Sequence, residues 1–196
     1  EKKSMNLSSG YFNTISPAQN SYLSLRISLE GGVKINKETN VTAADVDVKN
    51  GVIHVIDKVL LPPSVVDHAI SNESFSILVQ AVVKAGLVET LSGNGPFTIF
   101  APTDAAFEAL FALLGISGIA DLTADQLIPI LTYHVVSGNV RSSQLTAGPV
   151  ATLNGNIEIR LSPSPAINNT SNIIATDVQG SNGVIHVIDE VLLPSE

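Results

Sequence analysis

Asn182-Gly-Val-Ile-His-Val-Ile-Asp-Glu-Val-Leu-Leu-Pro194 is the stretch on which the fold prediction rests, because it occurs twice in the chain. The earlier copy is Asn50-Gly-Val-Ile-His-Val-Ile-Asp-Lys-Val-Leu-Leu-Pro62, which lies 132 residues upstream (182 − 50 = 132). Within these 13 positions only Lys58 and Glu190 differ. Solenoid repeats are much shorter, about 20–50 residues. The offset therefore predicts two copies of one whole domain.

The repeated stretch predicts a β-strand at the end of a hairpin. Its Asn-Gly start favours a turn, because both residues tolerate positive φ, and the Val- and Ile-rich run after it ends at a proline. Alternation puts apolar side chains on both faces, so the strand is expected to be covered on both sides. A second apolar run at residues 173–178 precedes it. The two strands are expected to form a hairpin whose tip, residues 179–183, is exposed.

The composition is that of a well-packed globular protein, and it argues against several classes of partner. The chain has 196 residues, 44% of them hydrophobic and 14% charged, with a net charge of −8 and a pI near 4.8. No cluster of Lys and Arg is present, so we expect neither nucleic acid nor an anionic membrane surface as a partner. No apolar run approaches the roughly 18 residues that cross a bilayer, so we expect no direct membrane insertion. The absence of cysteine excludes disulfides and thiolate metal sites.

The offset also predicts how the chain is organised. Residues 1–62 carry only strand signals, which fall on residues 156–194 when shifted by 132. We therefore predict that residues 1–62 are the second half of a first domain and that residues 63–196 are a complete second domain. The missing first half would occupy about 70 residues before Glu1 (132 − 62 = 70). A truncated chain is the favoured explanation, and the alternative is that this half was lost in evolution and something else covers the apolar surface.

Pro62-Pro63 joins the two predicted domains. Two consecutive prolines make a short, stiff, extended link. The domains are therefore expected to lie close together with little freedom.

Helical signals are confined to the first half of the second domain. One helix face is predicted to be buried because its apolar residues follow helical spacing, and Gly86 fits the position after its end. The residues of this face are Phe75, Leu78, Val79, Val82 and Val83.

Two further helices are predicted downstream. The first runs from an N-cap at Thr103 to Gly115 and buries Phe107, Leu110, Phe111 and Leu114. The second starts at a capping box formed by Thr123 and Gln126, and Pro129 is expected to interrupt it. Helices followed by hairpin-joined strands predict an α+β fold with mostly antiparallel sheets, rather than alternating β-α-β units.

Three ordered motifs resemble one known family. They are Gly95-Pro-Phe-Thr-Ile-Phe-Ala-Pro-Thr-Asp-Ala-Ala-Phe107, the pair Tyr133-His134, and the stretch from Asn182 to Pro194. In this order and spacing they resemble the fasciclin-like (FAS1) domain family over residues 63–196, and the second half of that domain over residues 1–62. The resemblance implies a wedge of two mostly antiparallel β-sheets packed with a helical layer, in tandem.

The same resemblance implies an extracellular or cell-surface adhesion module that binds proteins, matrix or glycans without catalysis. We expect no cofactor and no metal. In animal members an Asp-Ile pair before the last motif has been linked to integrin binding. The matching positions are Asp177-Val178 and, in the first copy, Asp45-Val46, with Val in place of Ile. The Tyr133-His134 region has also been linked to adhesion.

Each of these residues also has a structural interpretation. Tyr133 and His134 end a helix before an apolar pair, so they are candidate buried residues as well as candidate binding residues. A buried imidazole needs partners, and we expect His134 to bond Asp104 or a backbone carbonyl. His54 and His186 lie inside apolar strands and are expected to be structural, because the four histidines show no spacing typical of metal ligands.

Polar side chains gather at the predicted hairpin tip. They form either a binding surface or a solvated turn. The residues are Asp177, Gln179, Ser181 and Asn182. Asp57 and Asp189 follow the repeated strand, where a carboxylate that caps turn amides is favoured over a general base.

Three classes of function remain open at this stage. The favoured one is adhesion to a cell-surface or matrix protein or a glycan, with homophilic binding as one option, because tandem modules suit weak multivalent contacts. The second is a structural spacer that holds other modules off the surface. The third and least favoured is a glycan or ester hydrolase, since the chain has no Gly-x-Ser-x-Gly motif and no Cys nucleophile.

Overall fold

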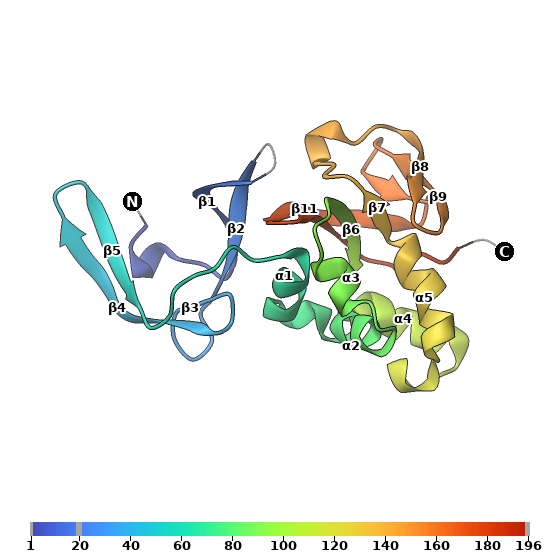
Figure 1. Ribbon diagram of the computed structural model, residues 1–196, viewed down its shortest axis with the longest axis horizontal. Helices are drawn as coiled ribbons and strands as arrows, with labels where there is room; N and C mark the ends of the chain where they lie inside the picture. Colours follow the sequence, from blue (N-terminus) through green and yellow to red (C-terminus); the bar gives the residue numbers. More distant parts are fainter. Residues whose placement is uncertain (1, 19–20, 195–196) are drawn as a thin grey trace.

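The computed structural model describes residues 2–18 and 21–194 and consists of two units joined at Pro62-Pro63 (Figure 1). We call residues 2–62 the N-terminal unit and residues 63–194 the C-terminal unit. Glu1, Ser195 and Glu196, which the predicted domain boundaries include, lie outside the described residues. Mostly antiparallel sheets with a layer of helices confirm the predicted α+β fold.

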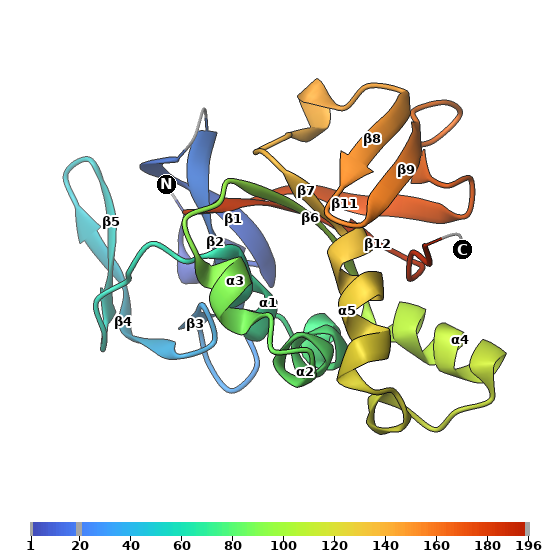
Figure 2. The same cartoon turned by 45° about the vertical axis from the view of Figure 1, so that its right-hand side comes forward.

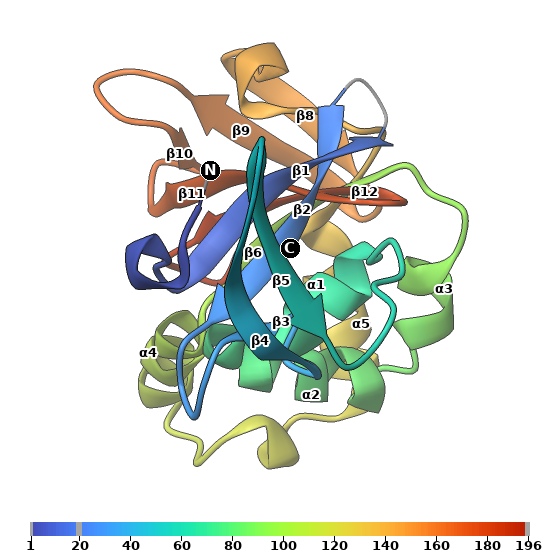
Figure 3. The same cartoon turned by 90° about the vertical axis from the view of Figure 1, so that its left-hand side faces the viewer.

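The N-terminal unit is a five-stranded sheet in which each strand pairs antiparallel with the next along the chain. Its elements are the 3₁₀ helix η1 (Ser4–Asn6) and strands β1 (Gly10–Ala18), β2 (Ser21–Ser28), β3 (Lys34–Ile35), β4 (Thr39–Val48) and β5 (Gly51–Ile56). The β4–β5 hairpin extends away from the C-terminal unit (Figures 1 and 3).

The C-terminal unit begins with a layer of helices that polar caps delimit. Its elements are α1 (Val65–Ser71), η2 (Glu73–Phe75), α2 (Ser76–Lys84), α3 (Val88–Ser92), α4 (Asp104–Leu114), η3 (Ile119–Asp121) and α5 (Ala124–Tyr133). Ser64, Thr103 and Thr123 precede α1, α4 and α5, and each side chain accepts a hydrogen bond from the third N–H of its helix. Gly115 ends α4 with a φ of 66°, as predicted.

The sheet of the C-terminal unit follows the order β7-β6-β12-β11-β10-β9-β8. The elements are β6 (Phe97–Pro102), β7 (Val135–Ser137), the 3₁₀ helix η4 (Ser142–Gln144), β8 (Gly148–Thr152), β9 (Gly155–Arg160), β10 (Ala166–Ile167), β11 (Ser171–Gly180) and β12 (Gly183–Ile188). Among the described strands of this sheet, β6 and β12 are the pair that runs parallel. The two-residue strand β10 carries the pairing from β11 to β9. Figure 2 shows β8 and β9 standing at an angle to β11, which gives the sheet its wedge shape.

Strand β12 lies at the centre of the core, and all six of its residues are buried. One face packs against the helical layer, and the other packs against β9 and the end of α5. The first cluster includes Phe75, Phe107, Leu127 and Ile185, and the second includes Phe100, Tyr133, Ile157 and Ile188. The prediction of a strand covered on both sides is confirmed for this copy.

The two units contact each other through β1 and β2 on one side and β11 and α1 on the other. The backbone N–H of Gln179 donates to Ser24 Oγ at 3.0 Å, and Arg26 Nη1 donates to the Ser71 carbonyl at 2.8 Å. The Tyr11 hydroxyl donates to the His68 carbonyl at 3.2 Å. The expected close placement of the units therefore agrees with direct hydrogen bonds between them.

Three expectations about the helical layer are wrong. Val83 is exposed, because the buried face of α2 runs through Leu78 and Ala81 instead. Leu114 is also largely exposed at the end of α4. Pro129 does not interrupt α5, which is continuous from Ala124 to Tyr133. In a regular helix the N–H of residue 129 would donate to the carbonyl of Asp125, but proline has no N–H. Asp125 is exposed, so water can hydrogen-bond its carbonyl instead.

The first copy of the repeated strand is not covered on both sides, and the prediction is wrong there. Ile53 is 51% exposed and Val55 45%, whereas the matching Ile185 and Val187 are 1% and 8% exposed. The residues are identical, so the difference comes from their neighbours. Strand β6 and the helical layer cover β12, but among the described residues nothing equivalent covers β5.

Candidate functional site

Ser, Asp and His side chains meet beside β12. The backbone N–H and the hydroxyl of Ser142 both donate to the Asp177 carboxylate. The backbone N–H of Asp177 donates to Nδ1 of His186 at 3.4 Å, so Nε2 carries the ring proton and donates to the Val140 carbonyl at 2.9 Å. Arg141 Nη2 lies 3.8 Å from the same carboxylate. This cluster ties the η4 loop to the β11–β12 hairpin.

The same cluster occurs in the N-terminal unit. Ser4 donates twice to Asp45, the N–H of Asp45 donates to His54 Nδ1 at 3.4 Å, and His54 Nε2 bonds the Lys2 carbonyl at 2.9 Å. Ser4 and Ser142 are 138 residues apart (142 − 4 = 138) rather than 132, because the β1–β2 hairpin is longer than the β8–β9 hairpin. Sequence reasoning with a single offset missed these serines. The sequence did carry one signal: a basic residue followed by serine occurs as Lys3-Ser4 and again as Arg141-Ser142. The two pairs are 138 residues apart, six more than the offset of 132.

The geometry of the cluster does not match a catalytic triad. A triad serine donates to the His base, and the His donates its other proton to the Asp. Here Ser142 donates to Asp177, and both nitrogens of His186 bond backbone groups, so no base is available to the serine. Burial lowers the pKa of His186. The hydrogen bonds from Ser4 likewise hold the pKa of the Asp45 carboxyl below its usual range.

Asp45 and Asp177 also shape the backbone. Both have left-handed φ values, 58° and 63°. Each lies where the pairing register of its hairpin shifts, at a β-bulge between β4 and β5 or between β11 and β12. Asp tolerates this conformation better than most residues. The structure therefore assigns both aspartates a clear role in the fold.

The tip of the β11–β12 hairpin is buried, contrary to the expectation of an exposed turn. Val178, Gln179 and Asn182 are all buried, although Ser181 is exposed. Asn182 accepts from the Val65 N–H at 3.0 Å and donates to the carbonyls of Leu91 and Gly93. The tip is covered because it caps the start of the helical layer and meets the N-terminal unit. In the first copy the β4–β5 tip is exposed.

Tyr133 and His134 are also buried. The Tyr133 hydroxyl donates to the Asn156 carbonyl at 2.8 Å and accepts from Asn168 at 3.1 Å. His134 Nδ1 donates to the Ile130 carbonyl at 2.7 Å, and Nε2 accepts from the Leu192 N–H at 2.9 Å. Burial lowers the pKa of His134 to about 4.

Asp104 does not contact His134, although that bond was one of the two expected. Its carboxylate accepts from the Ile77 N–H at 2.8 Å and from the Ser76 hydroxyl at 2.5 Å, and so it joins α4 to α2. Asp57 and Asp189 each accept from the backbone N–H of an Asn on the neighbouring strand, at 2.8 Å and 2.7 Å. These carboxylates bond backbone amides and show no convergence on a shared site.

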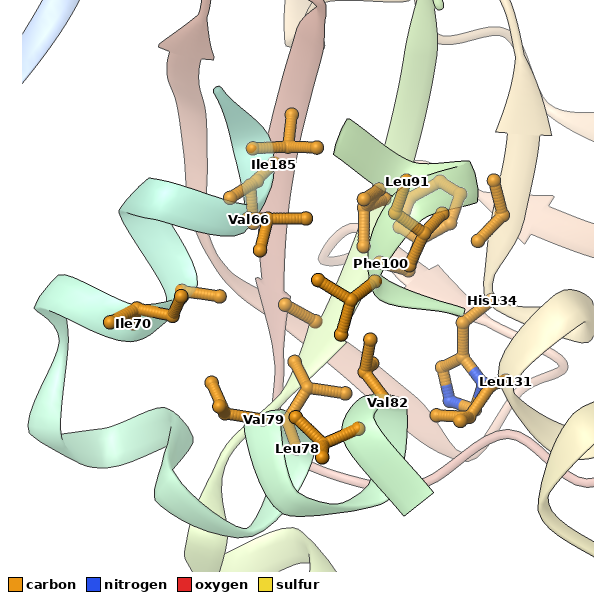
Figure 4. Close-up of a pocket in the computed structure, with 17 residues that line it drawn as sticks. Val66, Ile70, Leu78, Val79, Val82, Leu91, Phe100, Leu131, His134 and Ile185 are labelled. Atoms are coloured by element: carbon orange, nitrogen blue, oxygen red, sulfur yellow. The ribbon is translucent and has the colours of Figure 1, made fainter. Parts of the chain in front are cut away.

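A small apolar pocket lies between α1, α2 and α3 and the sheet (Figure 4). Its volume is about 100 Å³, and Val66, Ile70, Val82 and Phe100 are among its lining residues. His134 is the one polar side chain of the lining, and both of its ring nitrogens are already bonded. The pocket can hold an apolar group but offers no group for acid–base chemistry.

Exposed apolar side chains form a patch on one face of the β4–β5 hairpin, which we call the hairpin face. It consists of Val46, Val48, Ile53 and Val55. Val46 is 44% exposed, whereas its counterpart Val178 is 4% exposed. Asp45-Val46, one of the two predicted adhesion pairs, therefore lies at the edge of an accessible surface, and the second pair does not.

A comparison with protein families finds the model of the fasciclin domain twice, over residues 2–62 and residues 73–194. The chain belongs to the fasciclin domain family. The resemblance seen in the three sequence motifs is thereby confirmed.

Relatives in other organisms are similar in sequence, and a solved structure is similar in fold. The protein sll1483 of Synechocystis sp. is 47% identical over 132 residues, which cover 67% of this chain and 73% of the relative. The cell surface glycolipoprotein MPB83 of Mycobacterium bovis is 36% identical over 111 residues, covering 55% of this chain and 48% of the relative. A FAS1 domain pair from the insect cell adhesion molecule fasciclin I matches with a TM-score of 0.63 and 21% identity, over 94% of this chain and 67% of that one. The pair supports the fold.

Proposed function

We propose that this chain is a non-catalytic binding module that works outside the cell or on its surface, where it attaches to a protein, a matrix component or a glycan. The observation that carries the proposal is the hairpin face, an exposed apolar surface at positions where the second copy has the buried residues Val178, Ile185 and Val187. Contiguous exposed apolar surface marks interaction sites in soluble proteins. No helix among the described residues is long and apolar enough to cross a membrane.

Membership of the fasciclin family supports the extracellular setting. One relative is named as a cell surface glycolipoprotein, and the matching domain pair comes from a cell adhesion molecule. In this proposal Asp45 and Val46 contribute to the binding surface, because they occupy the positions of the family's Asp-Ile pair. Val46 belongs to the hairpin face, and Asp45 adjoins it. Asp177, Val178, Gln179, Asn182, Tyr133 and His134 act through the fold that presents that surface.

Bead capture tests the proposal. Beads coated with the chain are mixed with each other, with cells of the source organism, and with matrix proteins or glycans. Val46→Asp in the hairpin face is expected to reduce capture. Leu113→Asp, at an apolar position on α4 that is even more exposed, is the control and is expected to leave capture unchanged. Capture that both variants retain, or no capture of any kind, would refute a binding role for this face.

A structural spacer is the second candidate, and one observation favours it. Hydrogen bonds join the two units at several places: Arg26, Tyr11 and Lys37 donate to carbonyls of α1, and Ser24 accepts from the Gln179 N–H. A chain held in this way keeps a constant length between its ends. A spacer tolerates substitution of the whole hairpin face without loss of function, so the Val46→Asp variant distinguishes the two candidates.

A further inference from the structure

A histidine lies buried where the two units meet. His68 of α1 is fully buried, and the Tyr11 ring of β1 packs edge-on against it, with ring centroids 5.6 Å apart. Tyr11 also packs against the core cluster of the C-terminal unit that contains Val65 and Phe75. Figures 1 and 2 show β2 of the same N-terminal sheet beside α1 and β11. Part of what covers His68 therefore belongs to the other unit.

The hydrogen bonds of His68 fit only the neutral ring. Nε2 lies 3.2 Å from the Gln179 carbonyl oxygen, so this nitrogen carries the proton and donates it. Nδ1 is buried and has no hydrogen-bond partner among the described residues. A second proton would go to Nδ1 and find no acceptor there, and a buried charge without a partner is costly. Neutral His68 therefore fits between the units, and its imidazolium does not.

The charges around α1 do little to accommodate an imidazolium. On α1 itself the Asp67 carboxylate favours the charged ring, but it is already bonded to the N–H and the hydroxyl of Ser64. From the N-terminal unit come two cations, Arg26 and Lys37, which donate to carbonyls of the same helix. The remaining charged side chains on elements that contact α1 are either exposed or bonded elsewhere; they are Glu73, Lys84 and Glu89, all exposed, and Asp177, which bonds Ser142.

We propose that His68 is an acid-sensitive switch between the two units: when its ring takes up a second proton, the contact opens and the N-terminal unit moves away from α1, while both units stay folded. Opening lets water reach Nδ1 and accept its proton. It also removes the Tyr11 ring and the bond from its hydroxyl to the His68 carbonyl. The switch goes beyond the proposed binding role, because it controls how the two units are placed and not what either of them binds.

The direction of the pH effect follows from the burial of the ring. Burial in the closed contact lowers the pKa of His68, and the Gln179 carbonyl and the Asp67 carboxylate offset this only in part. In the open state the ring reaches water, where histidine has a pKa of about 6.5. Below that pH the open state binds more protons, so the closed contact loses stability as the pH falls below about 6.5. Between pH 7 and pH 5 one histidine can raise the ratio of open to closed molecules at most about 25-fold.

The distance between the units can be followed with dyes, because the chain has no cysteine of its own. Glu30→Cys beside β2 and Glu108→Cys on α4, both at exposed positions, carry a donor and an acceptor for single-molecule fluorescence transfer. We expect one main population at pH 7. At pH 5 a second population with a different transfer efficiency should grow at least about threefold. It should disappear again at pH 7, and the circular dichroism of the chain should be the same at both pH values.

Two substitutions show whether His68 is responsible. His68→Gln keeps a donor for the Gln179 carbonyl but takes up no proton, so it is expected to stay closed at pH 5. His54→Gln is the matched control, because it changes a histidine of β5 whose hydrogen bonds lie within the N-terminal unit, and it should open as the wild type does. Nitrogen-15 NMR of the histidine rings in the unsubstituted chain gives a check that needs no variant. Protonation of His68 and opening of the contact should share one midpoint.

Four results would overturn the inference. They are an unchanged distance at pH 5, opening of His68→Gln like that of the wild type, protonation of His68 without opening, and opening that is accompanied by loss of the circular dichroism signal. None of these measurements involves a partner, so bead capture tests the proposed function separately.

Discussion

Ile53 and Ile185 occupy the same position in two identical strands, yet Ile53 is 51% exposed and Ile185 only 1%. Ile185 packs against Phe75 and Leu127 in the core below the helical layer. Ile53 lies on the β4–β5 hairpin, which stands in front of the rest of the molecule in Figure 3. One sequence therefore serves as core in one copy and as surface in the other.

This difference predicts unequal costs for one substitution. Ile185→Ala should lower the free energy of unfolding by about 2–5 kcal/mol, because it leaves a cavity in a packed core. Ile53→Ala should cost less than about 1 kcal/mol, since half of that side chain is already in water. Urea unfolding of the two variants measures both values. Equal costs would show that the N-terminal unit covers Ile53 in solution.

Asp177 allows a structural role to be separated from a binding role. Asp177→Ala removes the acceptor of the Ser142 N–H and hydroxyl, and it places alanine at a φ of 63°. We expect the melting temperature to fall with a loss of about 1–3 kcal/mol. Asp177→Asn, which keeps an acceptor and tolerates this φ, should lose less. A variant that melts normally but fails in bead capture would instead identify Asp177 as a binding residue.

The pH dependence of stability should report the burial of His134. In the unfolded chain this histidine binds its proton near pH 6.5, but in the folded chain only near about pH 4. Between these values the unfolded chain binds more protons, so the free energy of unfolding falls as the pH falls. The slope for one histidine is at most about 1.4 kcal/mol per pH unit. Burial also lowers the pKa values of His68 and His186, which act in the same direction.

Urea unfolding between pH 7 and pH 4 checks this prediction. His134→Gln should be less stable than the wild type at pH 7, because the bonds to Ile130 and Leu192 are disturbed. Its stability should then fall less steeply toward pH 4, because one titrating group is gone. Parallel curves for the wild type and the variant would mean that His134 is not buried in its neutral form.

The contact between the two units depends on Ser24. Its buried hydroxyl accepts from the Gln179 N–H and donates to Asn13. Ser24→Ala leaves that buried N–H without its partner and should loosen the contact. Limited proteolysis with trypsin would detect this as faster cleavage after the exposed Lys58, four residues before Pro62. Ser28→Ala in the same strand removes only a 3.5 Å contact and is the matched control. Identical cleavage of both variants would contradict this role.

Much of the fold followed from local signals in the sequence. The caps at Thr103 and Thr123 and the left-handed Gly115 were predictable because each depends on a few neighbouring residues. The failures came from tertiary context. Whether Val83 or Ala81 faces the core depends on what packs against α2, and helical spacing alone allows either.

The candidate site was harder to predict than the fold. The sequence located Asp45-Val46 and Asp177-Val178 as a pair of equivalent motifs, but their exposure depends on chain elements that differ between the copies. The serine partners of both aspartates were missed because a longer hairpin breaks the offset of 132. The identical residues of β5 and β12 could not show that β6 lies beside β12 while no equivalent strand among the described residues lies beside β5.

Hydrogen–deuterium exchange of the unmodified chain tests the central claim most directly, which is that β5 is open where β12 is closed. Residues 51–56 and 183–188 have the same sequence and the same neighbours in the chain, so their intrinsic exchange rates are equal. The account predicts that amides of β5 exchange much faster than the matching amides of β12, because local opening of an uncovered edge costs less free energy. Equal protection of the two strands would contradict it, since β5 would then be covered in solution.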